Sequence, residues 1–209
     1  QDILRYPFPE KYPLLQEVLS QASIVVVHSQ LAEQFIRKAN YALPIYKVPL
    51  IDYQQPVNFD INQVENSLLK QLHQQKSSNA TFIMGVFGFG GVTKRSKSIF
   101  KAVSELDDET KSKLKLLIIG TDNYNADIEK MGLSDTIVCA GYINDADYNQ
   151  GLTLCDLIIN LRYPSMGETS AVQIQAMSAQ KATIVSDYGW FSELPNDTVH
   201  KISVDSSEV

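Results

Sequence analysis

The sequence predicts an α/β protein built on a doubly wound parallel sheet, and two observations support this fold class. Short runs of apolar and β-branched residues alternate with helical patterns along most of the 209-residue chain, as in sheets assembled from β-α-β units. Several of the runs are apolar at consecutive positions, which is typical of parallel strands covered on both faces. We therefore expect helices on both sides of one sheet, joined by right-handed crossovers.

Each expected element follows from one of these patterns. The expected strands are Ser23–His28, Ile45–Leu50, Thr81–Phe87, Lys115–Ile119, Thr136–Ala140, Leu157–Leu161 and Thr183–Ser186. The expected helices are Leu14–Ala22, Leu31–Asn40, Lys97–Glu105, Asp127–Met131, Asp145–Leu154 and Thr169–Gln180. A further helical pattern, with apolar positions at Ile61, Val64, Leu68, Leu69 and Leu72, lies in a Gln/Asn-rich stretch.

The polar stretch suggests a division of the chain into three parts. Residues 1–50 are expected to be the tail of a preceding domain, 51–77 a linker with a polar helix, and 78–209 the bulk of a second domain. The sequence begins without Met and ends without a closing element. We expect it to be a piece of a longer protein.

Composition narrows the range of functions. The net charge of −6 makes a nucleic-acid partner a poor expectation. No run approaches the roughly 20 apolar residues of a transmembrane segment. Cys139 and Cys155 lie within apolar runs and form no C-x-x-C pair, so we interpret both as reduced core residues of a cytosolic chain.

A candidate anion site lies in residues 161–180, LRYPSMGETSAVQIQAMSAQ. In a parallel sheet, ligands gather at the carboxyl ends of strands, where loops lead into helix N-termini. Gly167 permits close approach of an anion, and Thr169 and Ser170 add hydroxyl donors beside unpaired helix amides. This pattern suits a phosphate group.

Glu168 and Arg162 each have two interpretations. Glu168 is either a ligand-facing carboxylate or the second member of a capping box that begins at Ser165. Arg162 is either part of the site or a surface residue paired with Asp156 or Glu168.

A second strand-turn-helix unit, FIMGVFGFGGVTKRSKSIFKAV (82–103), carries a cluster of cations. Lys94, Arg95 and Lys97 fall where the helix opens, although cations there oppose the helix dipole. A bound anion would reverse that unfavourable sign, while a solvated basic turn is the alternative. The glycines before the cluster give neither a G-x-G-x-x-G fingerprint in register nor a Walker lysine motif. Together the two units predict a site for a diphosphate that acts as a leaving group.

Several segments resemble retaining glycosyltransferases of the GT-B fold, family 4 type. The most specific is LRYPSMGETSAVQIQAMSAQKATIVSDYGWFSELP (161–195), and VFGFGGVTKR (86–95) resembles the phosphate-gripping turn of that family. LKLLIIGTDN (114–123), IVCAGYINDADYNQGLTLCDLIINLRYP (137–164) and YPLLQEVLSQASIVVVHSQLAEQFI (12–36) also agree. The resemblance implies two Rossmann-like domains, of which the C-terminal one binds a nucleotide-sugar and is nearly complete here.

The resemblance also implies roles for the residues of the first turn. Lys94 matches the lysine that neutralises the donor phosphates, and Gly91 belongs to the same turn. Phe89 stands where the family often has an Arg, so we expect Arg95 to substitute from the other side. The base is expected near Tyr142, which otherwise is an ordinary half-buried aromatic residue.

The usual carboxylate pair of the family is not intact in this chain. Gln175 falls at the second glutamate, which usually holds the ribose hydroxyls, and Gly167 falls at the first, with Glu168 one position later. A glutamine donates to and accepts from a hydroxyl, but less strongly than a charged acceptor. Subgroups with a Gly-Glu-x-Ser turn are closer to this sequence.

The implied function is retaining transfer of a sugar, of the hexosyltransferase type, from a nucleotide-diphosphate sugar. Lys94, Arg95 and Glu168 are the expected catalytic side chains, with no metal ion and no cofactor. The acceptor is expected to be a saccharide or a lipid-linked molecule. We expect the present chain to bind the donor without transferring sugar, in the cytoplasm, with peripheral membrane association of the full-length protein left open.

Two other classes of function remain as alternatives. The altered carboxylate pair keeps a non-catalytic nucleotide-sugar binding or scaffold module open, and sugar turnover would distinguish it. A Rossmann oxidoreductase is disfavoured because its dinucleotide fingerprint is missing. In DYGWFSELP (187–195), we expect Trp190 to pack in a structural loop beneath the site, with Glu193 a weaker ligand candidate.

Overall fold

The computed structural model describes residues 13–38, 42–52, 58–88, 91–121, 123–165 and 167–204. Its main feature is a six-stranded, entirely parallel sheet in the order β5-β4-β3-β6-β7-β8. The strands are β3 (Phe82–Phe87), β4 (Leu114–Ile119), β5 (Ile137–Gly141), β6 (Leu157–Asn160), β7 (Ala182–Ser186) and β8 (His200–Ile202). The predicted doubly wound α/β class is confirmed.

Strand burial explains why the apolar runs become strands of the sheet. In β4, the sequence LKLLII is buried at every position except Lys115, which is half-buried. Such runs supply apolar groups to both faces of a sheet. β3 pairs with β4 in register along its whole length, from Phe82 opposite Leu114 to Phe87 opposite Ile119.

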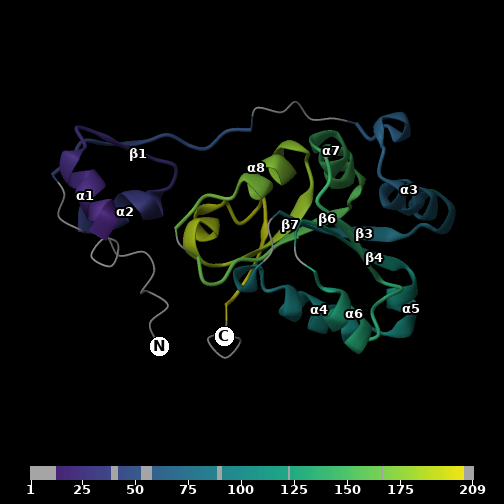
Figure 1. The fold of residues 1–209 in the computed structure, drawn as a ribbon. Helices are drawn as coiled ribbons and strands as arrows, with labels where there is room; N and C mark the ends of the chain where they lie inside the picture. Colours follow the sequence, from purple (N-terminus) through teal and green to yellow (C-terminus); the bar gives the residue numbers. More distant parts are fainter. Residues whose placement is uncertain are drawn as a thin grey trace.

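Helices cover both faces of the sheet (Figure 1). α3 (Ser67–Asn79), α7 (Asp145–Leu154) and α8 (Ala171–Ser178) lie over one face, where Leu69, Leu152 and Ala176 share a core with Ile83. α4 (Ser96–Ser104) and α6 (Asn125–Lys130) cover the opposite face with a second core. The N-terminal boundary expected after residue 77 lies inside α3, whose Leu69 and Leu72 are fully buried against the sheet.

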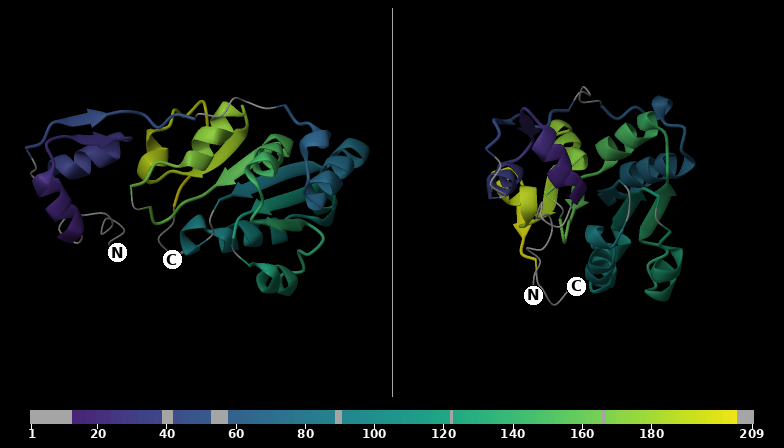
Figure 2. Two further views of the ribbon diagram at one scale, coloured as in Figure 1. Left: turned by 45° about the horizontal axis from the view of Figure 1, so that its top comes forward. Right: turned by 60° about the vertical axis from the view of Figure 1, so that its left-hand side comes forward.

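A smaller unit precedes the main sheet and lies beside it (Figure 2). It contains α1 (Pro13–Gln21), β1 (Val25–Val27), α2 (Gln30–Lys38) and β2 (Ile45–Lys47), and β1 pairs with β2 in parallel. The Glu193 carboxylate, from η5 (Gly189–Glu193) of the main unit, accepts hydrogen bonds from the backbone N–H groups of Gln30 and Leu31, at 2.8 and 2.7 Å. These two bonds join the smaller unit to the main one at the start of α2.

The structure differs from the sequence-based expectations at a few elements. α5 (Asp108–Ser112), β8 and the 3₁₀ turns η3 (Ile61–Gln63), η4 (Val92–Lys94) and η5 were not predicted. α8 begins at Ala171, two residues after the expected start, because Ser170 is extended and acts as the N-cap. The expected end of the second helix at Asn40 lies outside the described residues.

Candidate functional site

The two candidate turns lie side by side at the carboxyl ends of β3 and β6. These strands are neighbours in the sheet. The strands that follow β3 lie on one side of the pair, and the strands that follow β6 lie on the other. This is the topological switch point, where the loops of an open α/β sheet diverge and leave a crevice. The backbone N–H of Tyr163, after β6, donates to the carbonyl oxygen of Thr93, in the turn after β3, at 2.7 Å. The two loops are therefore in direct contact.

Lys94 is buried between these turns. Its side chain is 5 % exposed, and Nζ donates to the carbonyl oxygen of Phe87, at the end of β3, over 2.7 Å. A Cβ built on Gly88 would lie 3.3 Å from Lys94 Nζ and 3.4 Å from Cγ2 of Val172, in the first turn of α8. Burial, together with the charge of Arg162, lowers the pKa of Lys94 to about 8, while Glu168 acts in the opposite direction.

Arg162 and Glu168 form an ion pair beside Lys94. Nη1 of Arg162 lies 3.3 Å from Oε1 of Glu168, and Ser165 Oγ donates to the other carboxylate oxygen over 3.1 Å. Arg95 is also buried, with a φ of 55°, and burial lowers its pKa while nearby Tyr163 raises it. Two cations, Lys94 and Arg162, thus lie beside one carboxylate, Glu168, which leaves an excess of positive charge suited to an anion.

The start of α8 supplies backbone donors to the same place. Ser170 is the N-cap, and its Oγ accepts from the N–H of Gln173. Among the described residues, the N–H groups of Ala171 and Val172 have no protein acceptor, as is usual for a first helical turn. The capping-box interpretation of Glu168 is wrong, because the helix starts after Ser170 and Ser165 Oγ instead accepts from the N–H of Gly167.

A buried polar network fixes this helix start from below. Asn160, at the end of β6, donates through Nδ2 to Ser170 Oγ at 3.1 Å and to Gln173 Oε1 at 3.3 Å. Nε2 of Gln173 in turn donates to Thr183 Oγ1 in β7 at 2.9 Å. All four side chains are buried. Networks of this kind hold a loop in one arrangement because each broken bond leaves a buried polar group unsatisfied.

Close backbone packing requires glycine at the bottom of the site. A Cβ at Gly120, just after β4, would lie 2.2 Å from the carbonyl oxygen of Gly88. Gly88 in turn borders Lys94 Nζ. Any side chain at Gly120 would therefore displace the turn that carries the buried lysine.

Among the predicted site residues, the glycines have turn roles. Gly167 adopts a φ of 87°, which only glycine takes readily, and its N–H is engaged by Ser165. Gly91 has a φ of 132° and accepts from the N–H of Lys94 at 3.0 Å. The expected bare amide at Gly167 is thus not free, and the open donors lie further along, at Ala171 and Val172. Thr169 lies between Glu168 and the N-cap, half-buried.

Of the two residues expected at the nucleoside, Gln175 lies on α8 itself, whereas Tyr142 lies on another element and is exposed rather than half-buried. Tyr142 follows β5 and is 79 % exposed, separated from β3 by β4. Gln175 lies in the second turn of α8, half-buried, and its Oε1 accepts from the hydroxyl of Tyr148 in α7 at 3.0 Å.

Sequence reasoning missed several side chains of the site. The expected pairing of Arg162 with Glu168 is confirmed, but its place beside the buried Lys94 was not predicted, although its position directly after β6, at the carboxyl edge, is a usable signal. Asn160 and Tyr148 gave no such signal, because their roles depend on which helix packs beside them. The loop around Trp190 was predicted correctly: Trp190 is buried, and neighbouring Gly189 lies against Ser165 of the site.

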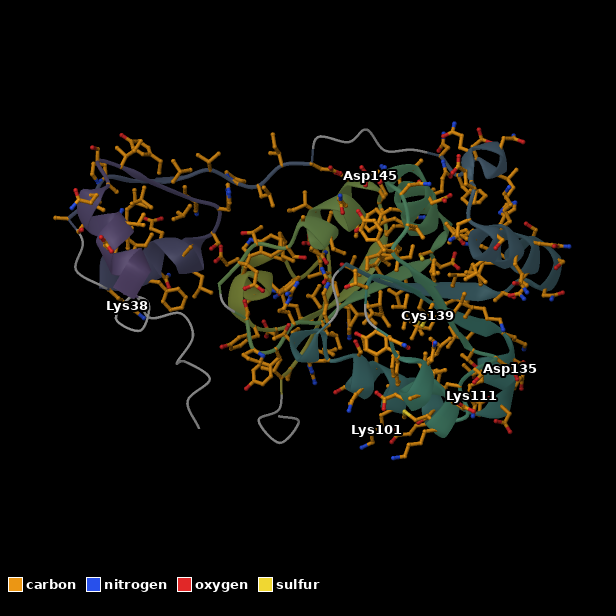
Figure 3. All side chains as sticks on the ribbon, viewed as in Figure 1. Lys38, Lys101, Lys111, Asp135, Cys139 and Asp145 are labelled. Atoms are coloured by element: carbon orange, nitrogen blue, oxygen red, sulfur yellow. The ribbon has the colours of Figure 1, made fainter. Side chains whose placement is uncertain are left out.

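Further findings concern features away from these turns. A hollow of about 610 Å³ lies at the β5 edge of the sheet, where Asp135 and Cys139 (Figure 3) border it, and its lining contains no predicted site residue. In the described ranges, no three His, Cys, Asp or Glu side chains gather as metal ligands would. The Asp145-Ala-Asp147 sequence has an Asp-x-Asp spacing, but Asp147 is buried and accepts from the N–H groups of Glu65 and Asn66. Within the described part of the chain, every helix is too short or too polar to cross a bilayer.

Comparison with known proteins links this geometry to one family. The sequence profile described as "Glycosyl transferases group 1" matches residues 70–209. A search of curated proteins by sequence found no match.

Solved structures share the fold at low sequence identity. Anabaena HepE in complex with UDP-glucose has a TM-score of 0.66 and 18% identity, over 95% of this chain and 55% of that one. Sucrose-phosphate synthase from Thermosynechococcus elongatus has a TM-score of 0.67 and 18% identity, over 93% and 49%. A glycosyltransferase from Rickettsia africae has a TM-score of 0.61 and 19% identity, over 89% and 50%. The chain therefore spans about half the length of these structures.

Proposed function

The chain belongs to the glycosyl transferases group 1 family, and on that premise we propose that it binds a nucleotide-diphosphate sugar as the donor for sugar transfer. The observation that carries the proposal is the position of Lys94. Its ammonium group lies buried where the turn after β3 meets the first turn of α8, beside Arg162. A diphosphate held there would meet cations from one loop and backbone donors from the other.

We propose that these groups stabilise the leaving diphosphate in a retaining transfer of the family 4 type. As the bond between the sugar and the phosphate breaks, negative charge grows on the diphosphate. Lys94, Arg95 and the start of α8 face the position of that charge, and fixed electrostatics of this kind supply several kcal/mol. We further propose that the excess of cations makes a metal ion or cofactor unnecessary, so that donor binding persists in EDTA.

The remaining site residues have proposed roles along the donor. Gly91 and Gly167 shape the two turns, while Thr169 and Ser170 border the phosphates. Glu168 faces the sugar, Gln175 contacts the ribose and Tyr142 lies toward the base. UDP is the first nucleotide to test, because HepE was solved with UDP-glucose.

We propose that the smaller unit is the tail of an acceptor domain whose remaining part lies outside this chain. Large apolar side chains on and around β1 and β2, including Val26 (54 % exposed) and Tyr46 (57 %), are open to solvent. The rest of such a domain would cover them. On this basis the chain alone binds the donor, and the longer protein transfers a hexose to a saccharide or lipid-linked acceptor in the cytoplasm, where the free thiols of Cys139 and Cys155 persist.

A thermal-shift panel tests the donor site directly. UDP-, GDP- and ADP-sugars are added to the chain and to Lys94→Met, with NAD as the probe for an oxidoreductase. At least one nucleotide-sugar is expected to raise the melting temperature of the unmodified chain but not of the variant. A response to NAD alone, or equal responses of both proteins, would contradict the proposal.

A non-catalytic binding module is the second candidate, favoured by Gln175 in place of a glutamate. Assays of donor binding and sugar turnover on the longer protein distinguish the two functions. Donor binding without any sugar turnover across an acceptor panel would support the module, and turnover would support the transferase.

A further inference from the structure

Tyr148 and Gln175 link α7 to α8 by a hydrogen bond that the proposed function does not use. The hydroxyl of Tyr148 donates to Gln175 Oε1 at 3.0 Å, and both side chains are half-buried. The Tyr148 ring also stands edge-on to Phe87, with ring centroids 5.3 Å apart. Phe87 is the residue whose carbonyl oxygen holds Lys94.

Gln175 lies in α8 beyond the helix start at which the diphosphate is proposed to bind. Gln175 follows Val172 by three residues, so both lie on the same side of the helix, and Val172 borders Gly88 next to Lys94. Five residues separate Gln175 from the N-cap Ser170, which corresponds to about 7.5 Å along the helix. In a nucleoside diphosphate anchored at the helix start, the ribose is the next group within reach.

The hydrogen bond determines which part of the amide is available. A glutamine amide accepts through its oxygen and donates through its NH₂ group. Tyr148 occupies the oxygen, and Nε2 has no partner among the described residues. Burial, together with the charge of Asp52, raises the pKa of Tyr148 to about 12, so the phenol remains a donor at neutral pH. Gln175 therefore presents its N–H groups.

Resting on the proposed function, we propose that Tyr148 is a positioning residue that turns the NH₂ group of Gln175 toward a ribose hydroxyl oxygen of the donor. A glutamate at this position, as the family resemblance suggests, could only accept from the ribose. This chain would thus donate a hydrogen bond to the ribose, where a glutamate would accept one.

Calorimetric titration with UDP, GDP and ADP, and with their 2′-deoxy and 3′-deoxy forms, tests the proposal. The unmodified chain is expected to prefer a ribonucleotide over one of its deoxy forms by about 3- to 10-fold, the effect of one hydrogen bond. Tyr148→Phe keeps the ring against Phe87 but removes the hydroxyl, and it should lose this preference, as should Gln175→Ala. Tyr46→Phe, which removes a hydroxyl from exposed β2, should keep it.

The double variant separates positioning from general packing. If Tyr148 acts only through Gln175, the double variant binds the ribonucleotide as weakly as Gln175→Ala alone. Additive losses, or a melting-temperature drop with an unchanged ribose preference in Tyr148→Phe, would overturn the positioning role while leaving the donor site intact. Failure of the unmodified chain to bind any of the three nucleotides would overturn the proposed function and this inference together.

Discussion

Lys94 Nζ lies 2.7 Å from the carbonyl oxygen of Phe87, so the buried ammonium group is held at the point where β3 leaves the sheet. One of its protons is used by the backbone, and the others are available to a ligand. Because burial lowers the pKa of Lys94 to about 8, its charge is lost just above neutral pH. Ligand binding and folding should both depend on this titration.

Affinity for a nucleoside diphosphate should fall as the pH rises from 7 to 9. Lys94 loses its proton over this range in the free protein, whereas a terminal phosphate, with a second pKa near 6, stays ionised. At pH 7, Lys94→Met should bind UDP about 10- to 100-fold more weakly, which is the loss of one hydrogen bond to a charged group. Calorimetry at three pH values measures both effects. An equal pH dependence in Lys94→Met would show that another group titrates.

Folding stability should respond to pH in the opposite direction. The folded pKa of Lys94 lies below its ordinary value of 10.5, so between about pH 8 and 10.5 the unfolded chain binds more protons. Stability from this group therefore rises with pH in that window, by about 3 kcal/mol at 1.36 kcal/mol per pH unit. In urea unfolding without ligand, Lys94→Met should have a higher free energy of unfolding than the unmodified chain at pH 7. This difference should shrink by pH 10. A constant difference between the two proteins would contradict this linkage.

Glu168→Gln should tighten UDP binding by about threefold at pH 7. The change removes the carboxylate beside Arg162 and Lys94 and leaves their charges for the ligand. The unfolding free energy should fall by less than about 1 kcal/mol, because this ion pair is partly exposed. Calorimetry and urea titration measure the two quantities. Weaker UDP binding would mean that Glu168 contacts the nucleotide itself.

Asp147→Ala should destabilise the chain by about 2–4 kcal/mol. Its buried carboxylate accepts from the N–H groups of Glu65 and Asn66, at 2.8 and 3.0 Å, and thereby fastens the start of α3 to α7. Removing it leaves buried donors without a partner. Asp145→Ala, an exposed position at the start of the same helix (Figure 3), is the control and should cost less than about 1 kcal/mol. Equal losses of unfolding free energy in the two variants, measured by urea unfolding, would contradict the role of Asp147 in holding α3 to α7.

Gly120→Ala should weaken both folding and UDP binding. The new Cβ would lie 2.2 Å from the backbone oxygen of Gly88, so the turn beside Lys94 must shift, at a cost of about 1–3 kcal/mol. Gly151→Ala is the matched control. Its Cβ would lie 2.6 Å from the end of the Ile119 side chain and in ordinary contact with the methyl groups of Leu69, at 3.6 and 3.7 Å, with no backbone atom in the way, and alanine favours the helix. Melting temperature and UDP affinity, measured together, should both drop for Gly120→Ala, while Gly151→Ala keeps its affinity.

The sequence predicted elements best where burial alone decides them. Apolar runs such as 114–119 became strands within a residue or two of their expected ends, since both of their faces are covered. β8 was not predicted because His200–Ile202 is short and half-exposed, and α5 was not predicted because its sequence DETKS has no apolar face. The helix α8 was predicted to start too early. Ser170, held by a hydrogen bond from Asn160, acts as the N-cap, so the helix starts only after it.

The meeting of the two turns was predictable, but the partners within the site were not. Parallel neighbouring strands place their carboxyl ends at one edge, so Lys94 and the start of α8 had to be close. Which cation would join them depended on the path of the loop after β6, and that path brings Arg162 rather than Lys97 next to Lys94. The amide orientation of Gln175 likewise follows from a tyrosine 27 positions away in the chain.

Glu193 concentrates the polar contact between the two units in one side chain. One carboxylate receives two adjacent N–H groups of α2, so a rotation of the smaller unit stretches both bonds together and neither can compensate for the other. Loss of this carboxylate would leave two N–H groups at the start of α2 without their present acceptor. Because Gly189 of η5 also lies against Ser165, the segment that holds the smaller unit is packed directly on the turn after β6.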